Sequence, residues 1–184
     1  MGSHLLLAPS LPAQMTREDP VLDAFRREVA YIFNTLQRLG ARPSEVEDLA
    51  QEVFIALRRS WENYDPARPL RPYLFGLVFR VFSGYRRKFK REVAFATVEL
   101  RDTALNADEL LQSKQTRAVL LSALEKIPLP RRAVLVMHEL DDIPMRQVAT
   151  ALSIPLFTAY SRLRKARKEL EATVRRLQQE LGGS

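Results

Sequence analysis

The sequence contains no cysteine, so neither a disulfide framework nor a thiolate metal site is available to it. Histidine is almost absent too: His138 is the only one beyond residue 4, and its apolar helical surroundings favour a structural role. No glycine-rich phosphate loop, HExxH or GxSxG motif occurs. Glu139, Asp141 and Asp142 cluster at a helix end, where a solvated turn is favoured over a cation site. We therefore expect no enzyme, no catalytic residue, no metal and no cofactor.

Long hydrophobic runs are also missing. No apolar run approaches the ~20 residues that span a bilayer. The short run at residues 5–8 lacks a basic region before it and is too short for a secretory signal. We expect a cytoplasmic protein without membrane insertion. Residues 1–4 are typical of an expression tag, so residues 1–18 are expected to form a tag and disordered N-terminus outside the fold.

Basic residues exceed acidic ones, but unevenly along the chain. The formal net charge is +7 and the isoelectric point is about 10. Residues 20–91 carry fourteen basic and eight acidic residues, and residues 116–184 carry twelve and seven. Residues 92–115 instead carry two basic and five acidic residues. Two basic blocks around an acidic connector suit two modules that contact one nucleic acid.

The periodicity of apolar residues predicts an all-α protein, since no strand-like alternation of useful length occurs. Asp19 and Pro20 predict a helix start, and Gly40 predicts its end. The pattern fades over residues 92–115. We therefore expect two small helical domains, 19–91 and 116–184, joined by a flexible linker at 92–115. The expected helices are 20–39, 44–59, 72–91, about 107–126, 131–140, 144–152 and a long one from 155.

The expected helix at 72–91 combines an apolar stripe with a run of positive charge. Leu74 and Val78 belong to its apolar stripe, which three phenylalanines widen. No acidic residue interrupts the segment from Arg80 to Arg91. A polyanion could lie along this basic stripe, although the segment alone is more typical of a solvated face on a core helix.

The segment from Pro144 to Leu170 has the proportions of a helix-turn-helix. Its second helix carries hydroxyl and cationic side chains opposite the apolar positions, a mixture that suits base edges and phosphates in a major groove. A plain helical hairpin is the alternative on spacing alone. The candidate DNA-binding residues are Thr158, Tyr160, Ser161, Arg162, Arg164, Lys165 and Lys168.

Three segments in order resemble the extracytoplasmic-function (ECF) group of bacterial RNA polymerase sigma factors. They are EVEDLAQEVFIALRR (45–59), YDPARPLRPYLFGLVFR (64–80) and LPRRAVLVMHELDDIPMRQVATALSIPLFTAYSRLRKARKEL (129–170). The resemblance implies a region 2-like promoter-melting and polymerase-binding domain and a region 4-like helix-turn-helix domain. It implies a sigma factor that binds core RNA polymerase and directs promoter recognition and transcription initiation.

The same resemblance implies partners and sites. The partners are core RNA polymerase, through its beta and beta-prime subunits, promoter DNA and an anti-sigma factor. The second-domain helix from residue 156 to 168 would read the minus-thirty-five element. Polymerase docking would use Glu47, Asp48, Leu49, Gln51, Glu52 and Leu57. Minus-ten DNA binding would use Arg71, Tyr73, Arg80, Tyr85, Arg86, Arg87 and Lys88.

The chain departs from the family pattern at two places. Relatives usually carry Arg-Asn and, four residues on, an Asp before the Tyr, whereas this chain has Phe79, Arg80 and Gly84 before Tyr85. Phe79 and Gly84 cannot hydrogen-bond a base edge, which predicts an altered minus-ten preference. Ser153 stands in the helix-turn-helix turn where glycine is frequent, so a strained left-handed residue is expected there.

Two other interpretations stay open at this point. One is a stand-alone dimeric helix-turn-helix regulator that dimerises through its long C-terminal helix. The other is a sigma-like protein-interaction module without initiation activity.

Overall fold

The computed structural model describes residues 19–95 and 111–182, and its side chains are described for 19–91 and 116–176. Within these ranges every regular element is helical, as predicted. The predicted disordered residues 1–18 and most of the predicted linker lie outside the described residues. The first half contains α1 (Pro20–Leu39), η1 (Pro43–Glu45), α2 (Val46–Ser60), η2 (Trp61–Asn63) and α3 (Leu70–Phe95). The second contains α4 (Leu111–Glu125), α5 (Leu129–Leu135), the π-helical turn η3 (Val136–Leu140), α6 (Met145–Ala151) and α7 (Leu156–Gly182).

Helix α1 has the ends that its sequence predicts. The Asp19 carboxylate accepts hydrogen bonds from the backbone N–H groups of Val21 and Leu22, at 3.0 and 3.4 Å. Gly40 ends the helix with a φ of +98°, a conformation that glycine adopts without strain. The predicted start of the next helix at residue 44 is wrong by two residues. A 3₁₀ turn forms there first, because the Glu45 carboxylate accepts the Arg42 N–H at 2.9 Å.

The first half is a three-helix unit with an aliphatic and aromatic core. Its largest fully buried side chains include Ile32, Leu36, Phe75 and Phe82, which come from α1 and α3. The predicted apolar stripe of α3 is therefore confirmed along most of its length. A second small cluster, of Val21, Leu57, Leu74 and Leu77, fills the far end of the unit.

The second half contains the predicted helix-turn-helix, formed by α6 and α7. Val148 from α6 and Ala159, Leu163 and Ala166 from α7 are buried. The small side chain of Ala149 on α6 is buried as well, and α6 packs against α7. Ser153 adopts the predicted left-handed conformation in the turn, with a φ of +53°.

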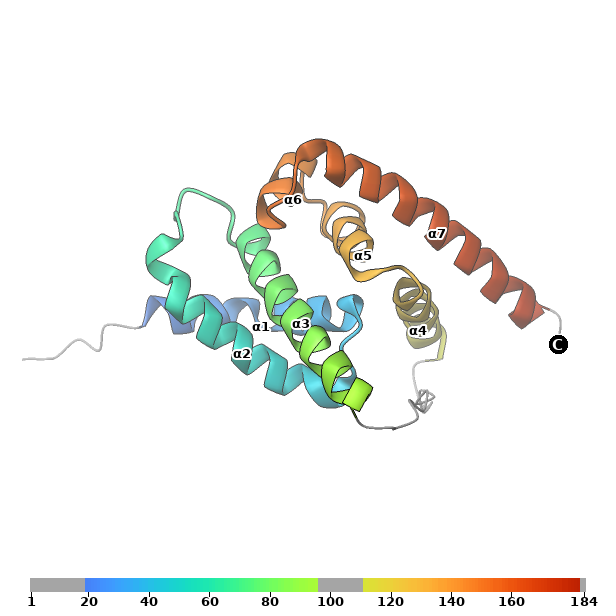
Figure 1. Ribbon diagram of the computed structural model, residues 1–184, viewed down its shortest axis with the longest axis horizontal. Helices are drawn as coiled ribbons and strands as arrows, with labels where there is room; N and C mark the ends of the chain where they lie inside the picture. Colours follow the sequence, from blue (N-terminus) through green and yellow to red (C-terminus); the bar gives the residue numbers. More distant parts are fainter. Residues whose placement is uncertain (1–18, 96–110, 183–184) are drawn as a thin grey trace, which may run out of the picture.

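The two halves share one continuous hydrophobic core, which the sequence did not predict. Buried residues of α1 and α3 belong to the same cluster as Val134 and Met137 of the second half. Figure 1 shows α6 beside the start of α3, while α7 runs along the outer edge. A Cβ atom at Gly76 of α3 would lie only 2.6 Å from the Ala151 carbonyl oxygen of α6. These two backbones therefore approach so closely because residue 76 is glycine.

Polar groups also bridge the halves. The buried Arg132 guanidinium donates to the Leu39 carbonyl at the end of α1 at 2.5 Å, and to the carbonyls of Glu125 and Ile127. Asp141 accepts from Tyr31 and Arg38, both at 2.8 Å. Burial raises the pKa of Asp141 despite these two donors. We call this surface the interdomain joint, formed by Tyr31, Arg38, Leu39, Gly76, Arg132, Asp141 and Ala151.

Candidate functional site

The outward face of α7 carries the predicted DNA-binding residues. At 100° per residue, the buried stripe of Ala159, Leu163 and Ala166 turns the intervening positions away from the core. Within the described part of the chain, no acidic side chain pairs with the cations of this face. Tyr160, Arg164, Lys165 and Lys168 are exposed, and Thr158, Ser161 and Arg162 are half-buried. All seven predicted residues therefore lie outside the core.

Other cations near this face are already neutralised. Arg131 donates two hydrogen bonds to Glu169, at 3.0 and 2.6 Å. Arg167 forms an ion pair with Glu139. The contrast indicates which α7 cations are available to phosphate groups.

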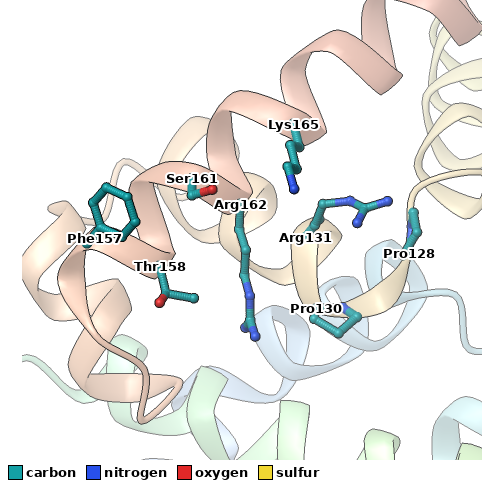
Figure 2. Close-up of a pocket in the computed structure, with 8 residues that line it drawn as sticks. All are labelled: Pro128, Pro130, Arg131, Phe157, Thr158, Ser161, Arg162 and Lys165. Atoms are coloured by element: carbon teal, nitrogen blue, oxygen red, sulfur yellow. The ribbon is translucent and has the colours of Figure 1, made fainter.

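A shallow groove of about 410 Å³ lies between the start of α5 and this face of α7. Figure 2 shows Lys165 of α7 above Arg131 of α5, while the Arg162 side chain extends downward to the side of Pro130. The polar lining of this groove consists of hydroxyl and cationic groups, which can bind the oxygen atoms of a nucleic-acid backbone. The lining residues are Pro128, Pro130, Arg131, Phe157, Thr158, Ser161, Arg162 and Lys165.

Sequence reasoning missed Phe157 on this face. Its side chain is 83% exposed, more than that of any other large hydrophobic residue in the described ranges. Ser161, Arg164 and Lys168 follow it at intervals of four, three and four residues. That spacing could have shown that Phe157 lies on the same helix face as these polar residues, at its N-terminal end.

Four of the predicted minus-ten residues of α3, Arg71, Arg80, Arg87 and Lys88, are exposed. Arg71 also forms an ion pair with Glu28 at 3.0 Å. The guanidinium of Arg86 lies 6.0 Å from the ring centre of Phe82, which holds it against the helix.

The two predicted tyrosines are used inside the fold. The Tyr73 hydroxyl donates to the backbone oxygen or Oγ of Ser60, at 2.9 and 2.7 Å. The Tyr85 hydroxyl donates to Glu45 Oε1 at 2.6 Å. Burial and this bond raise the pKa of Tyr85. Each hydroxyl therefore anchors α3 to a neighbouring segment, and both rings are half-buried.

Helix α2 presents four of its six predicted docking residues. Glu47, Asp48, Gln51 and Glu52 are exposed. The other two, Leu49 and Leu57, are 4% and 0% exposed. A partner docked on the outer face cannot touch these leucines, so their effect on docking is limited to positioning the helix.

Ile55 is a second residue that sequence reasoning missed. It is 40% exposed and follows Asp48 and Glu52 by seven and three residues, on the same face of the helix. An apolar residue framed by carboxylates suits a protein partner that is both basic and apolar.

No described helix is both long and apolar enough to cross a membrane. The described side chains also contain no group of three or more metal-ligating residues. His138 has an internal role: its Nδ1 lies 3.0 Å from the Ile143 carbonyl oxygen.

Two family models match the chain, one in its first half and one in its second half. Sigma-70 region 2 matches residues 24–92, and sigma-70 region 4 matches residues 117–170.

Among curated proteins, the ECF RNA polymerase sigma factor SigE of Mycolicibacterium smegmatis is 26% identical over 149 residues. That match covers 79% of this chain but only 58% of SigE, so the chain spans little more than half of that relative. RNA polymerase sigma factor YlaC of Bacillus subtilis is 22% identical, with 90% of this chain and 98% of YlaC covered.

Two solved structures share the fold. One is the sigma factor RpoE in complex with the anti-sigma factor NepR from Bartonella quintana, with a TM-score of 0.64 and 19% identity. That match covers 82% of this chain and 96% of RpoE. The other is CnrH in complex with the cytosolic domain of CnrY, with a TM-score of 0.60 and 20% identity over 83% of this chain and 85% of CnrH.

Proposed function

The chain belongs to the sigma-70 family as an ECF sigma factor, and we propose that it binds core RNA polymerase and directs promoter recognition and transcription initiation. The observation that carries this proposal is the outward face of α7, whose cations have no acidic partner among the described residues. A surface of that kind suits a polyanion such as DNA. Sigma factors are not enzymes, which agrees with the absence of catalytic motifs from the sequence.

The two halves have separate tasks in this proposal. Residues 19–91 form the region 2-like domain, residues 116–184 form the region 4-like domain, and residues 92–115 connect them. The protein acts in the cytoplasm, where promoter DNA and the polymerase are found. An anti-sigma factor regulates it, a role supported by the complex of the structural relative RpoE with the anti-sigma factor NepR.

Polymerase docking uses the exposed face of α2. Glu47, Asp48, Gln51 and Glu52 supply negative charge, and Ile55 adds an apolar contact on the same face. Leu49 and Leu57 hold the helix in place from the core. The beta-prime subunit of the polymerase would provide the main basic surface opposite them.

Promoter contacts use α3 and α7. On α3, Arg80, Arg87 and Lys88 bind phosphates of the separated strand. Tyr73 and Tyr85 anchor α3 through their hydroxyls in the free protein, and their ring faces would stack on bases of the separated strand. On α7, the seven residues predicted from the sequence contact the minus-thirty-five element.

Transcription with purified components tests the function. The chain is mixed with core RNA polymerase and fragmented genomic DNA of its source organism, and the 5′ ends of the transcripts are mapped. We expect new start sites that core enzyme alone does not produce, each preceded by shared minus-ten and minus-thirty-five elements. A stand-alone regulator would bind duplex DNA without producing transcripts, and a protein-interaction module would do neither. Either result would contradict the proposal.

A further inference from the structure

We propose that Phe157 is a specificity-determining residue that reads the methyl group of a thymine in the major groove of the upstream promoter element. This inference rests on the proposed function, since it requires α7 to enter DNA. The starting observation is that the Phe157 ring is 83% exposed although phenylalanine is usually buried. An aromatic ring held in water on a cationic face is available to a ligand.

The position of Phe157 on the helix gives its direction. It is the second residue of α7, and Ser161, Arg164 and Lys168 continue its row along the outer face. The buried residues Ala159 and Leu163 point the opposite way. Recognition helices of this motif place their N-terminal residues against base edges. Phe157 therefore lies at the N-terminal end of this face, where a recognition helix contacts bases, and the cations follow it along the helix.

The chemistry of the ring selects its target. A phenyl group offers no conventional hydrogen bond to the donors and acceptors that guanine, cytosine and adenine present in the major groove. Thymine alone adds an apolar C5-methyl group there. Thr158 and Ser161, beside the ring along the groove in Figure 2, can hydrogen-bond the neighbouring base edge or phosphate. The combination favours a thymine next to a polar contact.

The same exposure makes the residue suitable for mutation. The side chain lies outside the buried core, so Phe157→Ala should leave folding unchanged. Phe157→Leu keeps an apolar side chain of smaller reach and serves as the graded variant. Thermal unfolding of both variants checks that α7 stays in place.

The experiment uses holoenzyme reconstituted from the full chain and core polymerase. Binding duplexes are selected from a library randomised throughout the upstream promoter region. In the selected duplex each thymine is then replaced singly by uracil, which differs only in lacking the methyl group. We expect one such replacement to weaken wild-type binding roughly fourfold, the effect of one buried methyl group. Phe157→Ala should bind the thymine and uracil duplexes equally, and Phe157→Leu should fall between.

The outcomes are distinguishable. If a duplex is selected but no uracil replacement affects wild-type binding, or Phe157→Ala keeps the full discrimination, this inference is overturned and the proposed function stands. If Phe157→Ala weakens association with core polymerase in the absence of DNA and leaves the uracil effect intact, the ring contacts protein and the inference is again overturned. If holoenzyme selects no upstream element and starts no transcription, both fail.

Discussion

Two arginines in the second half of the chain illustrate how the interdomain joint differs from the outward faces. Arg132 is 3% exposed, and its guanidinium donates to three backbone carbonyls. Burial lowers its pKa to about 10, so it is still charged at neutral pH. Arg164 is exposed, with no carboxylate paired to it in the described ranges. A cation whose partners are already inside the fold supports structure, whereas one without such partners is available to a ligand.

This difference separates stability from binding. Substitutions at the interdomain joint should reduce stability, and substitutions on the outward faces should reduce binding while leaving the fold intact. Pairs of variants, one at the feature in question and one at a control position, can test that division.

The largest effect is expected on the outward face of α2. Reversing the charge of Asp48 and Glu52 together to Lys should weaken association with core polymerase roughly a hundredfold or more, because two carboxylates would face a basic partner with the wrong sign. The free energy of unfolding should change little, since both side chains are exposed. Fluorescence titration with core enzyme measures the affinity. Glu62→Lys, an exposed acid outside α2, is the control, and equal affinities for both variants would refute this docking face.

The next effect is expected at the interdomain joint. Arg132→Met should reduce the free energy of unfolding by about 3 kcal/mol, because it leaves buried carbonyl oxygens of Leu39 and Ile127 without a donor. The neighbouring Arg131→Met breaks only a half-exposed ion pair with Glu169 and should cost under about 1 kcal/mol. Urea unfolding compares the two variants. Equal costs would mean that the buried guanidinium is not important to the joint.

Two glycines of α3 provide a third matched pair. Gly76→Ala should destabilise the protein by about 1–3 kcal/mol, because its Cβ would collide with the Ala151 carbonyl and force α3 and α6 apart. Gly84 has open space around it, so Gly84→Ala should stabilise the helix by up to about 1 kcal/mol. Thermal unfolding measures whether each variant is more or less stable than the wild type. Small-angle scattering should show expansion for Gly76→Ala alone. A neutral Gly76→Ala would show that the two halves do not pack this closely in solution.

The smallest effect concerns pH. Because burial raises the pKa of Asp141, the folded protein binds this proton more tightly than the unfolded chain does. Its contribution to stability should therefore rise as the pH falls through the interval between the raised pKa and the ordinary value near 4. Urea unfolding measures the free energy of unfolding across this interval. As the pH falls, the value for the wild type should rise relative to that for Asp141→Asn. If the wild-type value instead decreases relative to Asp141→Asn as the pH falls, the donors Tyr31 and Arg38 outweigh burial in setting the pKa of Asp141.

The sequence predicted features that depend on near neighbours. Asp19 and Gly40 act through groups within four residues, and both ends of α1 were confirmed. The left-handed conformation of Ser153 was predicted differently, from the resemblance, because relatives often carry glycine at that position. Leu49 and Leu57 lie at helical spacing from the buried Val53 and are buried with it, whereas the family motif grouped them with exposed docking residues.

Features that depend on distant partners could not be predicted. Arg132 meets the Leu39 carbonyl 93 residues away, and Tyr85 meets Glu45 across 40 residues. No periodicity distinguishes Arg132 from Arg164 or a free tyrosine from an anchored one, because the distinction arises only when helices pack. For this reason the sequence did not reveal that Tyr73 and Tyr85 are hydrogen-bonded within the fold. The α7 set depends on the spacing of one helix and lies on the expected face.

In the proposed function the exposed cations Arg80 and Arg87 of α3 hold the melted promoter strand, and permanganate reactivity of thymines near a mapped start site measures that melting. Wild-type holoenzyme should make those thymines reactive. The variant with Ala at both Arg80 and Arg87 should bind core polymerase and the duplex minus-thirty-five element normally, yet leave the thymines protected. Transcription by this variant should recover on a pre-melted template. Full reactivity with the double variant, or equal impairment on duplex and pre-melted templates, would contradict the account.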